Sequence, residues 1–265
     1  MTYTERISLA ISPAVSSLRL ISCLMIVSCH FLQAYSNDWA FVLNTGVQAF
    51  LLISGLLYGI YGISDVKSFY SKRIKKVYVP YRLWTAIITI LLIIFAPEHI
   101  TYRRVVAQIL MLGTLDGQSH LWFIPILFLC YLILPIIASI RSPRISFLVI
   151  VSLITILFCG FAVTGEANLL WIATYFIGYM LGRYSKIIKY ISLPIIVSLL
   201  FLLCRPDIIE MFQDKTLIGR GVHILFAIGL LLLSVQLVCL RNLLSVRILP
   251  PPEKYQIRPF VKSCK

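Results

Sequence analysis

The sequence is divided by eight apolar runs, most of them close to the length that crosses a lipid bilayer. A transmembrane helix needs about 20 mainly apolar residues. Only 13% of the 265 residues are charged, so a water-soluble fold would lack the polar residues to cover its surface. The sequence therefore predicts an all-α, polytopic transmembrane helix bundle of about eight spans: Ser17–Ala34, Val42–Tyr61, Val79–Ala96, Leu121–Ile140, Ile145–Val163, Leu169–Gly182, Ile191–Cys204 and Val222–Leu240.

The distribution of basic residues over the loops sets the orientation of these spans. With the N-terminus inside, the inner segments up to Arg247 carry fifteen Lys and Arg residues, and the outer loops carry five. Because loops rich in Lys and Arg stay in the cytoplasm, we predict a cytoplasmic N-terminal segment (1–16), a transmembrane domain (17–246) and a basic, disordered tail (247–265). The net charge of +14 is assigned to orientation and contact with membrane lipid, and not to nucleic acid.

The first span contains two ionisable side chains, Arg19 near its inner end and His30 deeper in the membrane. Such groups are costly inside a bilayer. Eleven residues make about three helical turns, so both side chains project from one side, about 17 Å apart. This arrangement suits a ligand with an anionic part at Arg19 and a reactive end at the imidazole. The alternative, given about equal weight, is an orienting arginine and a histidine bonded to a neighbouring helix.

The second span carries glycines at 46, 55 and 59, which allow close helix packing, and Ser54, which could bond across a helix interface. A packing seam is the favoured reading, and a site wall against the first span is the alternative. In the next inner loop, Lys72, Arg73, Lys75 and Lys76 lie within five residues. Such a cluster can hold a polyphosphate, although it also acts as a topology signal.

The fourth span opens with His120 and Trp122 at the outer interface. Trp122 could line an acceptor site or anchor the helix, and His120 could line that site or be solvated. Pro125, about one turn in, could end the first turn, kink the helix or unwind it locally. The seven cysteines form no CxxC pair, so we predict neither a zinc site nor a disulfide framework, and no metal.

Four segments between Arg19 and Tyr131 together resemble the membrane-bound acyltransferase-3 family, whose members acylate bacterial surface polysaccharides and similar acceptors. Arg19 and His30 are similar to the family's R/K-x10-H signature. The other three segments are similar to its second-helix, basic-loop and leucine-tryptophan-phenylalanine motifs. In chain order the residues are Arg19 and His30; Gly46-Val47, Phe50 and Ile53-Ser54-Gly55; Phe69, Lys72, Arg73, Lys76, Pro80 and Tyr81; and Leu121-Trp122-Phe123 with Pro125.

The resemblance implies an O-acetyltransferase of the bacterial inner (cytoplasmic) membrane. It would move an acetyl or other short acyl group from acetyl-CoA to a sugar hydroxyl of lipopolysaccharide O-antigen or another surface polysaccharide, free or lipid-linked. It implies His30 as base or acyl relay, with Arg19 holding the donor or orienting the site. The other residues assigned are Lys72, Arg73, Lys76 and Tyr81 for the nucleotide end of the donor, and Ser54, His120 and Trp122 for the acceptor.

Two further readings stay open. A transporter or flippase of lipid-linked sugar would predict more charges inside the spans and repeated halves, and neither is visible. Members of the family usually have more spans than this chain, so the third reading is an inactive acyltransferase remnant truncated at its C-terminus.

Overall fold

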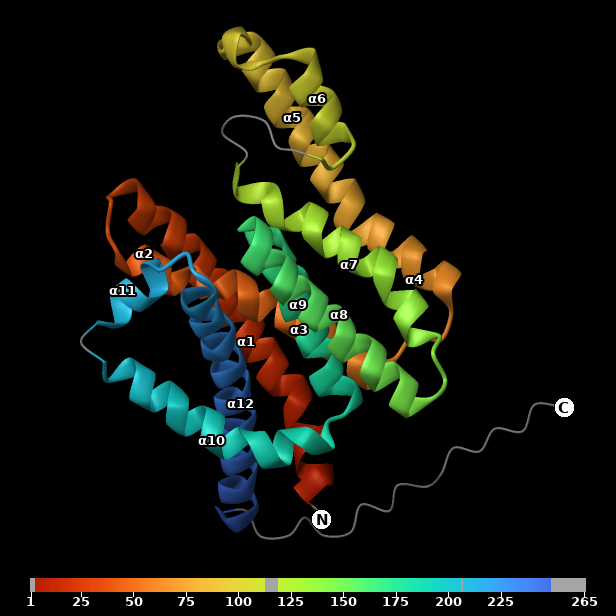
Figure 1. The fold of residues 1–265 in the computed structure, drawn as a ribbon, viewed down its shortest axis with the longest axis vertical. Helices are drawn as coiled ribbons and strands as arrows, with labels where there is room; N and C mark the ends of the chain where they lie inside the picture. Colours follow the sequence, from red (N-terminus) through yellow and green to blue (C-terminus); the bar gives the residue numbers. More distant parts are fainter. Residues whose placement is uncertain (1–2, 113–118, 206, 249–265) are drawn as a thin grey trace, which may run out of the picture.

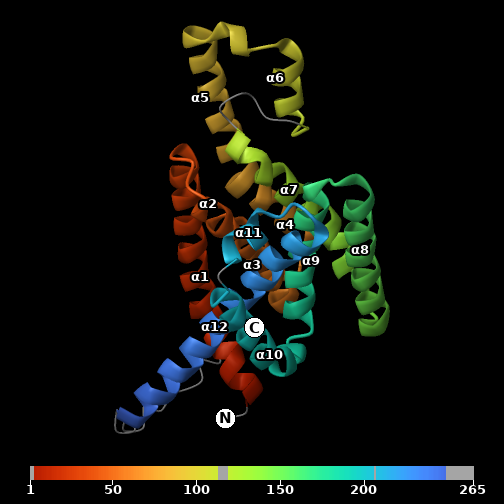
Figure 2. The ribbon, with the colours of Figure 1, turned by 60° about the vertical axis from the view of Figure 1, so that its left-hand side comes forward.

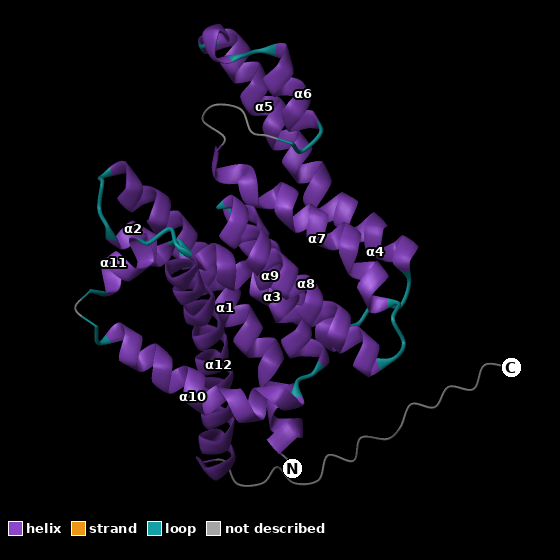
Figure 3. Cartoon of the chain, in the orientation of Figure 1, coloured by secondary structure: helices purple, strands orange, loops and turns teal. Residues whose placement is uncertain are grey.

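The apolar runs fold as helices, because a backbone in lipid must satisfy its own hydrogen bonds. The structure, a computed structural model, describes residues 3–112, 119–205 and 207–248, and every regular element in these ranges is helical (Figure 3). In chain order the elements are α1 (Tyr3–Ala34), α2 (Trp39–Leu43), α3 (Thr45–Tyr61), α4 (Val66–Arg73), a π-helical turn (Ile74–Tyr78), α5 (Val79–Phe95), a 3₁₀ turn (Pro97–His99), α6 (Tyr102–Ile109), a second 3₁₀ turn (Ser119–Trp122), α7 (Phe123–Ala138), α8 (Pro143–Thr164), α9 (Ala167–Arg183), α10 (Lys186–Leu203), α11 (Ile208–Gln213) and α12 (Leu217–Ile248).

Each predicted span falls on helical structure, and the all-α polytopic fold class is confirmed. Five stretches of the described chain are long and apolar enough to cross a membrane, and two shorter apolar helices accompany them. The five are Pro13–Ala34, Trp39–Tyr61, Val66–Phe95, Pro143–Thr164 and Leu217–Cys239, and the two shorter ones are Phe123–Ala138 and Ile191–Leu203. The remaining predicted span corresponds to α9, whose 17 residues are largely buried.

The first and last helices, α1 and α12, extend beyond the predicted spans. Helix α1 begins at Tyr3, so most of the predicted segment 1–16 continues the helix of the first span. Helix α12 ends at Ile248, and the predicted tail from residue 249 onward lies outside the described residues. The starts of α1 and α8 and the ends of α3, α9 and α12 lie toward one end of the bundle, as the predicted topology requires (Figures 1 and 2).

Helices α3 and α9 form the centre of the bundle through facing glycines (Figure 1). A Cβ on Gly55 would lie 2.8 Å from the Tyr179 nitrogen, and one on Gly59 would lie 2.6 Å from the Arg183 nitrogen. A Cβ on Gly178 would in turn lie 2.8 Å from the Leu52 carbonyl carbon. Both helices therefore carry small residues four apart that let their backbones touch. The predicted packing seam is confirmed, and its partner for Gly55 and Gly59 is α9.

Three apolar cores surround this seam. The first joins α1, α3 and α12, the second joins α3, α7, α8 and α9, and the third joins α2, α10, α11 and α12. Helices α5 and α6 extend from this body as a hairpin (Figures 1 and 2). Only Tyr81 and Thr85 of α5 are buried, both near its start. The other candidate residues are therefore positioned mainly by the packed body of α1, α3, α4, α7 and α9.

Candidate functional site

Helix α1 has three distinct sides. One side is buried in the bundle and a second is exposed and apolar, as expected for contact with lipid. The buried side holds Leu18, Ser22 and Cys29, and the exposed apolar side holds Leu20, Leu24, Val27 and Phe31. Helix α1 is continuous from Arg19 to His30. At 100° per residue, both side chains therefore lie on the third side, between the buried side and the exposed apolar side.

The side of α1 that carries Arg19 and His30 borders the core of α3, α7 and α9. Ile26, which lies on the same edge of the helix at 100° per residue, packs against that core. Both candidate side chains are exposed, although neither shares the lipid-facing side. Arg19 and His30 are therefore placed along one edge of a protein surface, one near each end of the span.

His30 lies one turn before the outer end of α1. Its Nδ1 is 3.1 Å from the Oε1 of Gln33, the next residue along the helix on that edge. Because an amide oxygen only accepts hydrogen bonds, this contact assigns the proton to Nδ1 and leaves Nε2 as the basic nitrogen. Gln33 is thus placed to favour the tautomer whose lone pair is on Nε2.

The core beside this edge of α1 contains a group of aromatic side chains, among them Tyr58 in α3 and Tyr131 in α7. The Tyr58 and Tyr131 rings meet edge to face with centroids 5.9 Å apart, and the Tyr131 and Tyr175 rings do so at 6.1 Å. These rings form an inner cluster to which α3, α7 and α9 contribute.

Arg73 lies inside this cluster, enclosed by three rings. Its guanidinium carbon is 5.2 Å from the Tyr58 centroid, 5.4 Å from that of Tyr131 and 5.9 Å from that of Phe69. Its Nε is buried without a hydrogen-bond partner among the described residues. A planar cation over aromatic faces is stabilised by their quadrupoles. This geometry makes Arg73 a structural centre of the inner cluster, unlike its exposed neighbour Lys72.

The lysines of the basic loop face outward. Lys72 lies in the last turn of α4, Lys75 and Lys76 lie in the π-helical turn, and all three are exposed. Within this turn the Val79 N–H donates to the carbonyl of Ile74, five residues earlier. Pro80 follows directly and has no N–H to continue the ordinary ladder. The π turn therefore lies at a break of the ladder and displays two adjacent cations at the predicted cytoplasmic edge.

Tyr81, the other residue assigned to the donor, is buried at the start of α5. Its hydroxyl has no hydrogen-bond partner among the described residues. A buried hydroxyl without a partner costs free energy, so this phenol is available for a ligand or an ordered water.

The residues assigned to the acceptor are only partly brought together. The Ser54 hydroxyl donates to the Phe50 carbonyl of its own helix at 2.8 Å, and the bond predicted across the interface is not made. The Trp122 ring lies 4.7 Å from that of Trp171 in α9. The side chain of His120 lies outside the described part of the chain. Pro125 sits in the first turn of α7, directly after the 3₁₀ turn, where its missing N–H breaks no intrahelical bond.

Trp122 also lines a cavity of about 760 Å³ between α6, α7 and the start of α9. Most of its wall is apolar, with Asn168 and Tyr78 as polar members. The Trp122 indole and the Asn168 amide give this wall a flat apolar face and hydrogen-bonding groups. Such a wall can accept one face of a sugar ring.

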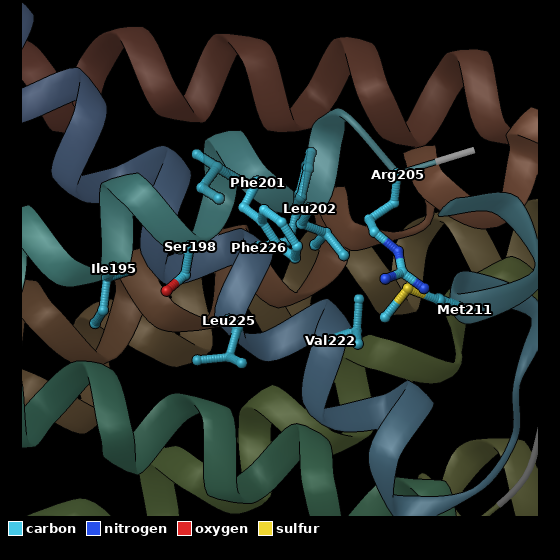
Figure 4. Close-up of a pocket in the computed structure, with 10 residues that line it drawn as sticks. Ile195, Ser198, Phe201, Leu202, Arg205, Met211, Val222, Leu225 and Phe226 are labelled. Atoms are coloured by element: carbon cyan, nitrogen blue, oxygen red, sulfur yellow. The ribbon is translucent and has the colours of Figure 1, made fainter. Parts of the chain in front are cut away.

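A second cavity, of about 330 Å³, lies between α10, α11 and α12 (Figure 4). Its wall is apolar apart from Ser198 and Arg205. The Asp207 carboxylate accepts two bonds of 2.8 Å from the Arg205 guanidinium, and these bonds hold the pKa of Asp207 below its usual range. The only cation at this cavity is thus already paired, and neither Arg19 nor His30 lines it.

His223, near the outer end of α12, is a further buried histidine. Its Nδ1 is 2.9 Å from the Thr45 hydroxyl, and its Nε2 is 3.0 Å from the Phe212 carbonyl. A carbonyl only accepts, so Nε2 carries the proton and Nδ1 accepts from Thr45. Both ring nitrogens are therefore occupied, and His223 ties α3, α11 and α12 together.

The inner aromatic cluster was not predicted, because its members occur in different apolar runs. A weak signal existed in the tyrosines at 58, 131 and 175, since a phenol in a span needs a polar partner. The facing glycines of α9 had a clearer one, because Gly178 and Gly182 repeat the small-xxx-small spacing of Gly55 and Gly59.

Comparison with known proteins gives one family match. A model of the acyltransferase-3 family, described as an acyltransferase domain, matches residues 13–248, from α1 to the end of α12. No curated protein matches the chain, and no solved structure does. The matched range contains α1 from Pro13 onward and every later helix discussed above.

Proposed function

Because the chain belongs to the acyltransferase-3 family and is a multi-pass membrane acyltransferase, we propose that it transfers an acetyl or another short acyl group from acetyl-CoA to a sugar hydroxyl. The single observation that carries this proposal is the shared edge of α1. It places a cation near the cytoplasm and an imidazole near the outer surface beside one core.

The donor enters from the cytoplasm, where its phosphates meet exposed cations. We assign the phosphates to Lys72 and Lys76, whose ammonium groups are free of the aromatic cluster. Arg73 is enclosed by rings, so we assign it a positioning role, which holds α4 against α3 and α7. The Tyr81 hydroxyl is the remaining candidate for a contact with the nucleotide end.

The thioester reaches toward His30 along the edge that begins at Arg19. His30 Nε2 takes the proton of the acceptor hydroxyl, and the oxygen attacks the thioester carbonyl carbon. The carbon–sulfur bond then breaks, and the coenzyme A thiolate takes the proton back from the imidazolium. In the relay form, Nε2 attacks the thioester carbonyl carbon, and the carbon–sulfur bond breaks to release the coenzyme A thiolate. The acceptor hydroxyl then attacks the acyl carbon, the bond to Nε2 breaks, and the freed imidazole takes the hydroxyl proton and passes it to the thiolate. Since a thioester is already activated, positioning and proton transfer supply most of the catalysis.

The acceptor is a surface glycan or its lipid-linked precursor, such as lipopolysaccharide O-antigen. Trp122 and Asn168 line a cavity wall suited to a sugar ring, and the buried Trp171 packs against Trp122. We place the protein in the bacterial inner membrane, because that bilayer borders the compartment that contains acetyl-CoA.

Mass spectrometry of surface glycans tests the proposal. Cells that make the wild-type chain should add one acetyl mass per modified sugar, and His30→Ala should lower this by at least about 100-fold, the usual contribution of a general base. The matched control is Val27→Ala, one turn away on the lipid-facing side of α1, which should keep the modification. Full acetylation by His30→Ala at equal membrane abundance would refute the assignment.

The role of Gln33 gives a finer test. Gln33→Leu removes the acceptor at Nδ1, so part of the histidine population adopts the other tautomer and the rate falls. Gln33→Glu keeps an acceptor there and favours the protonated ring, so the pH–rate profile should shift to higher pH. Unchanged pH profiles in both variants would contradict a positioning role for Gln33.

A further inference from the structure

A cavity of about 700 Å³ lies at the predicted cytoplasmic edge of the bundle, between the start of α8 and the end of α9. The proposed transfer reaction uses none of its residues. Helix α8 contributes Pro143, Arg144, Phe147 and Leu148, and the end of α9 contributes Arg183, Tyr184 and Ser185. The two helices run side by side here, as both ribbon views show (Figures 1 and 2).

The cavity wall is held in place by contacts between the α7–α8 loop and α9. Arg183 donates through Nη1 to the Tyr179 hydroxyl at 2.9 Å and through Nη2 to the Ile140 carbonyl at 3.0 Å. The Tyr184 hydroxyl donates to the Pro143 carbonyl at 2.6 Å. These bonds use two of the five N–H groups of Arg183 and fix the position of its guanidinium.

Two positive charges meet at this cavity. Arg144 is exposed in the first turn of α8, and Arg183 is half-buried opposite it. Within the described ranges neither arginine forms an ion pair. The N-terminal end of α8 adds a partial positive charge. Two guanidinium groups without a counter-ion, of which Arg183 is fixed by hydrogen bonds, favour an anion with several oxygens, and a phosphate fits that description.

The other side of the cavity is apolar and faces lipid. The Phe147 ring meets Tyr184 edge to face at 5.4 Å, and Leu148 is 63% exposed. Ile145, 56% exposed, continues the same face of α8. A soluble phosphate compound would satisfy the arginines and leave this wall uncovered. A phospholipid would cover both, with its phosphate at the arginines and its acyl chains along α8.

We propose that this cavity binds the headgroup of an anionic phospholipid from the cytoplasmic leaflet, with Arg144 and Arg183 on the phosphate. The bound lipid would join the α7–α8 loop to the end of α9. Because α9 packs on α3 through its glycines, the lipid would stabilise the helix pair at the centre of the bundle.

Native mass spectrometry of the purified full chain, with phosphatidylglycerol or phosphatidylcholine added to the detergent, tests this site. We expect preferential retention of phosphatidylglycerol and a rise in Tm with that lipid. Arg144→Gln should weaken retention about fivefold, the factor for one basic residue worth about 1 kcal/mol near an anionic lipid. Arg141→Gln, three residues earlier in the loop before α8 and outside the cavity wall, is the matched control.

Three outcomes would overturn the proposal. Equal retention of both lipids would show that the site does not select an anionic headgroup. Equal losses of phosphatidylglycerol retention in Arg144→Gln and Arg141→Gln would indicate a diffuse charge effect. Displacement of phosphatidylglycerol by inorganic phosphate or glycerol phosphate would identify a soluble phosphate ligand. Because Arg144 is exposed, its substitution leaves the fold intact, and acetylation in cells reports separately on the proposed transfer activity.

Discussion

Gly46 sets the distance between α3 and α1, and replacing it by alanine tests whether α1 must be held in place. A Cβ at position 46 would lie 2.8 Å from the Ser22 carbonyl oxygen, 2.9 Å from the Met25 Cβ and 3.1 Å from the Ile26 Cγ1. All three neighbours lie on α1, between Arg19 and His30. The first is backbone of a continuous helix, so it cannot move out of the way by a change of rotamer.

The size of the effect follows from these distances. Ordinary van der Waals contact begins near 3.4 Å, so α1 must move away by about 0.6 Å at Ser22. Overpacking of this kind costs about 1–3 kcal/mol, which lowers Tm by several degrees in a chain of this size. Because a misplacement near 1 Å can cost about 100-fold in rate, we expect Gly46→Ala to lower transfer more than its Tm suggests.

Differential scanning fluorimetry in detergent and glycan mass spectrometry measure the two effects. Gly221→Ala in α12 is the matched control, because a Cβ there meets no atom within 4 Å. This control should keep both Tm and transfer. If Gly46→Ala matched it in both measurements, close packing of α1 on α3 would not position Arg19 and His30.

Three further predictions concern the surrounding structure. Arg73→Lys keeps the charge and loses the planar group between the rings, so the free energy of unfolding should fall by about 1 kcal/mol in a denaturant titration. Thr45→Val leaves the buried Nδ1 of His223 without its donor and should cost about 1–3 kcal/mol by the same measurement, whereas Thr45→Ser should cost less. The pKa of Asp207 is lowered by its bond with Arg205. The bond therefore contributes fully to stability above the ordinary aspartate pKa, and this contribution is lost as pH falls through the lowered pKa. Asp207→Asn should flatten the acid side of a Tm–pH curve, and an unchanged curve would contradict this linkage.

Several features were predictable because they depend on short stretches of chain. A run of about 20 apolar residues must form a helix in lipid, so the spans, and with them the fold class, followed from composition and length. Helical periodicity alone placed Arg19 and His30 on one side of α1. The family resemblance also rested on local motifs, and the match over residues 13–248 confirms it.

Other features depend on which helices meet, and the sequence does not encode this locally. Gly55 and Gly59 pack on α9, and any span with small residues at the right spacing could have been their partner. Arg73 looked equivalent to Lys72 in the sequence. Only the packing of α3 and α7 against α4 places Tyr58 and Tyr131 around the Arg73 guanidinium.

The sequence by itself determined that the chain lies in lipid, which segments form its spans, and that a cation and an imidazole share one edge of α1. It could do so because the lipid and the helical geometry act on each segment separately. The tertiary structure decided which side chains are available to a ligand. It joined Thr45 to His223 across 178 residues and brought Arg144 to Arg183 at one cavity. Such contacts arise from packing between helices distant in sequence, and hydrophobic periodicity carries no information about the partner.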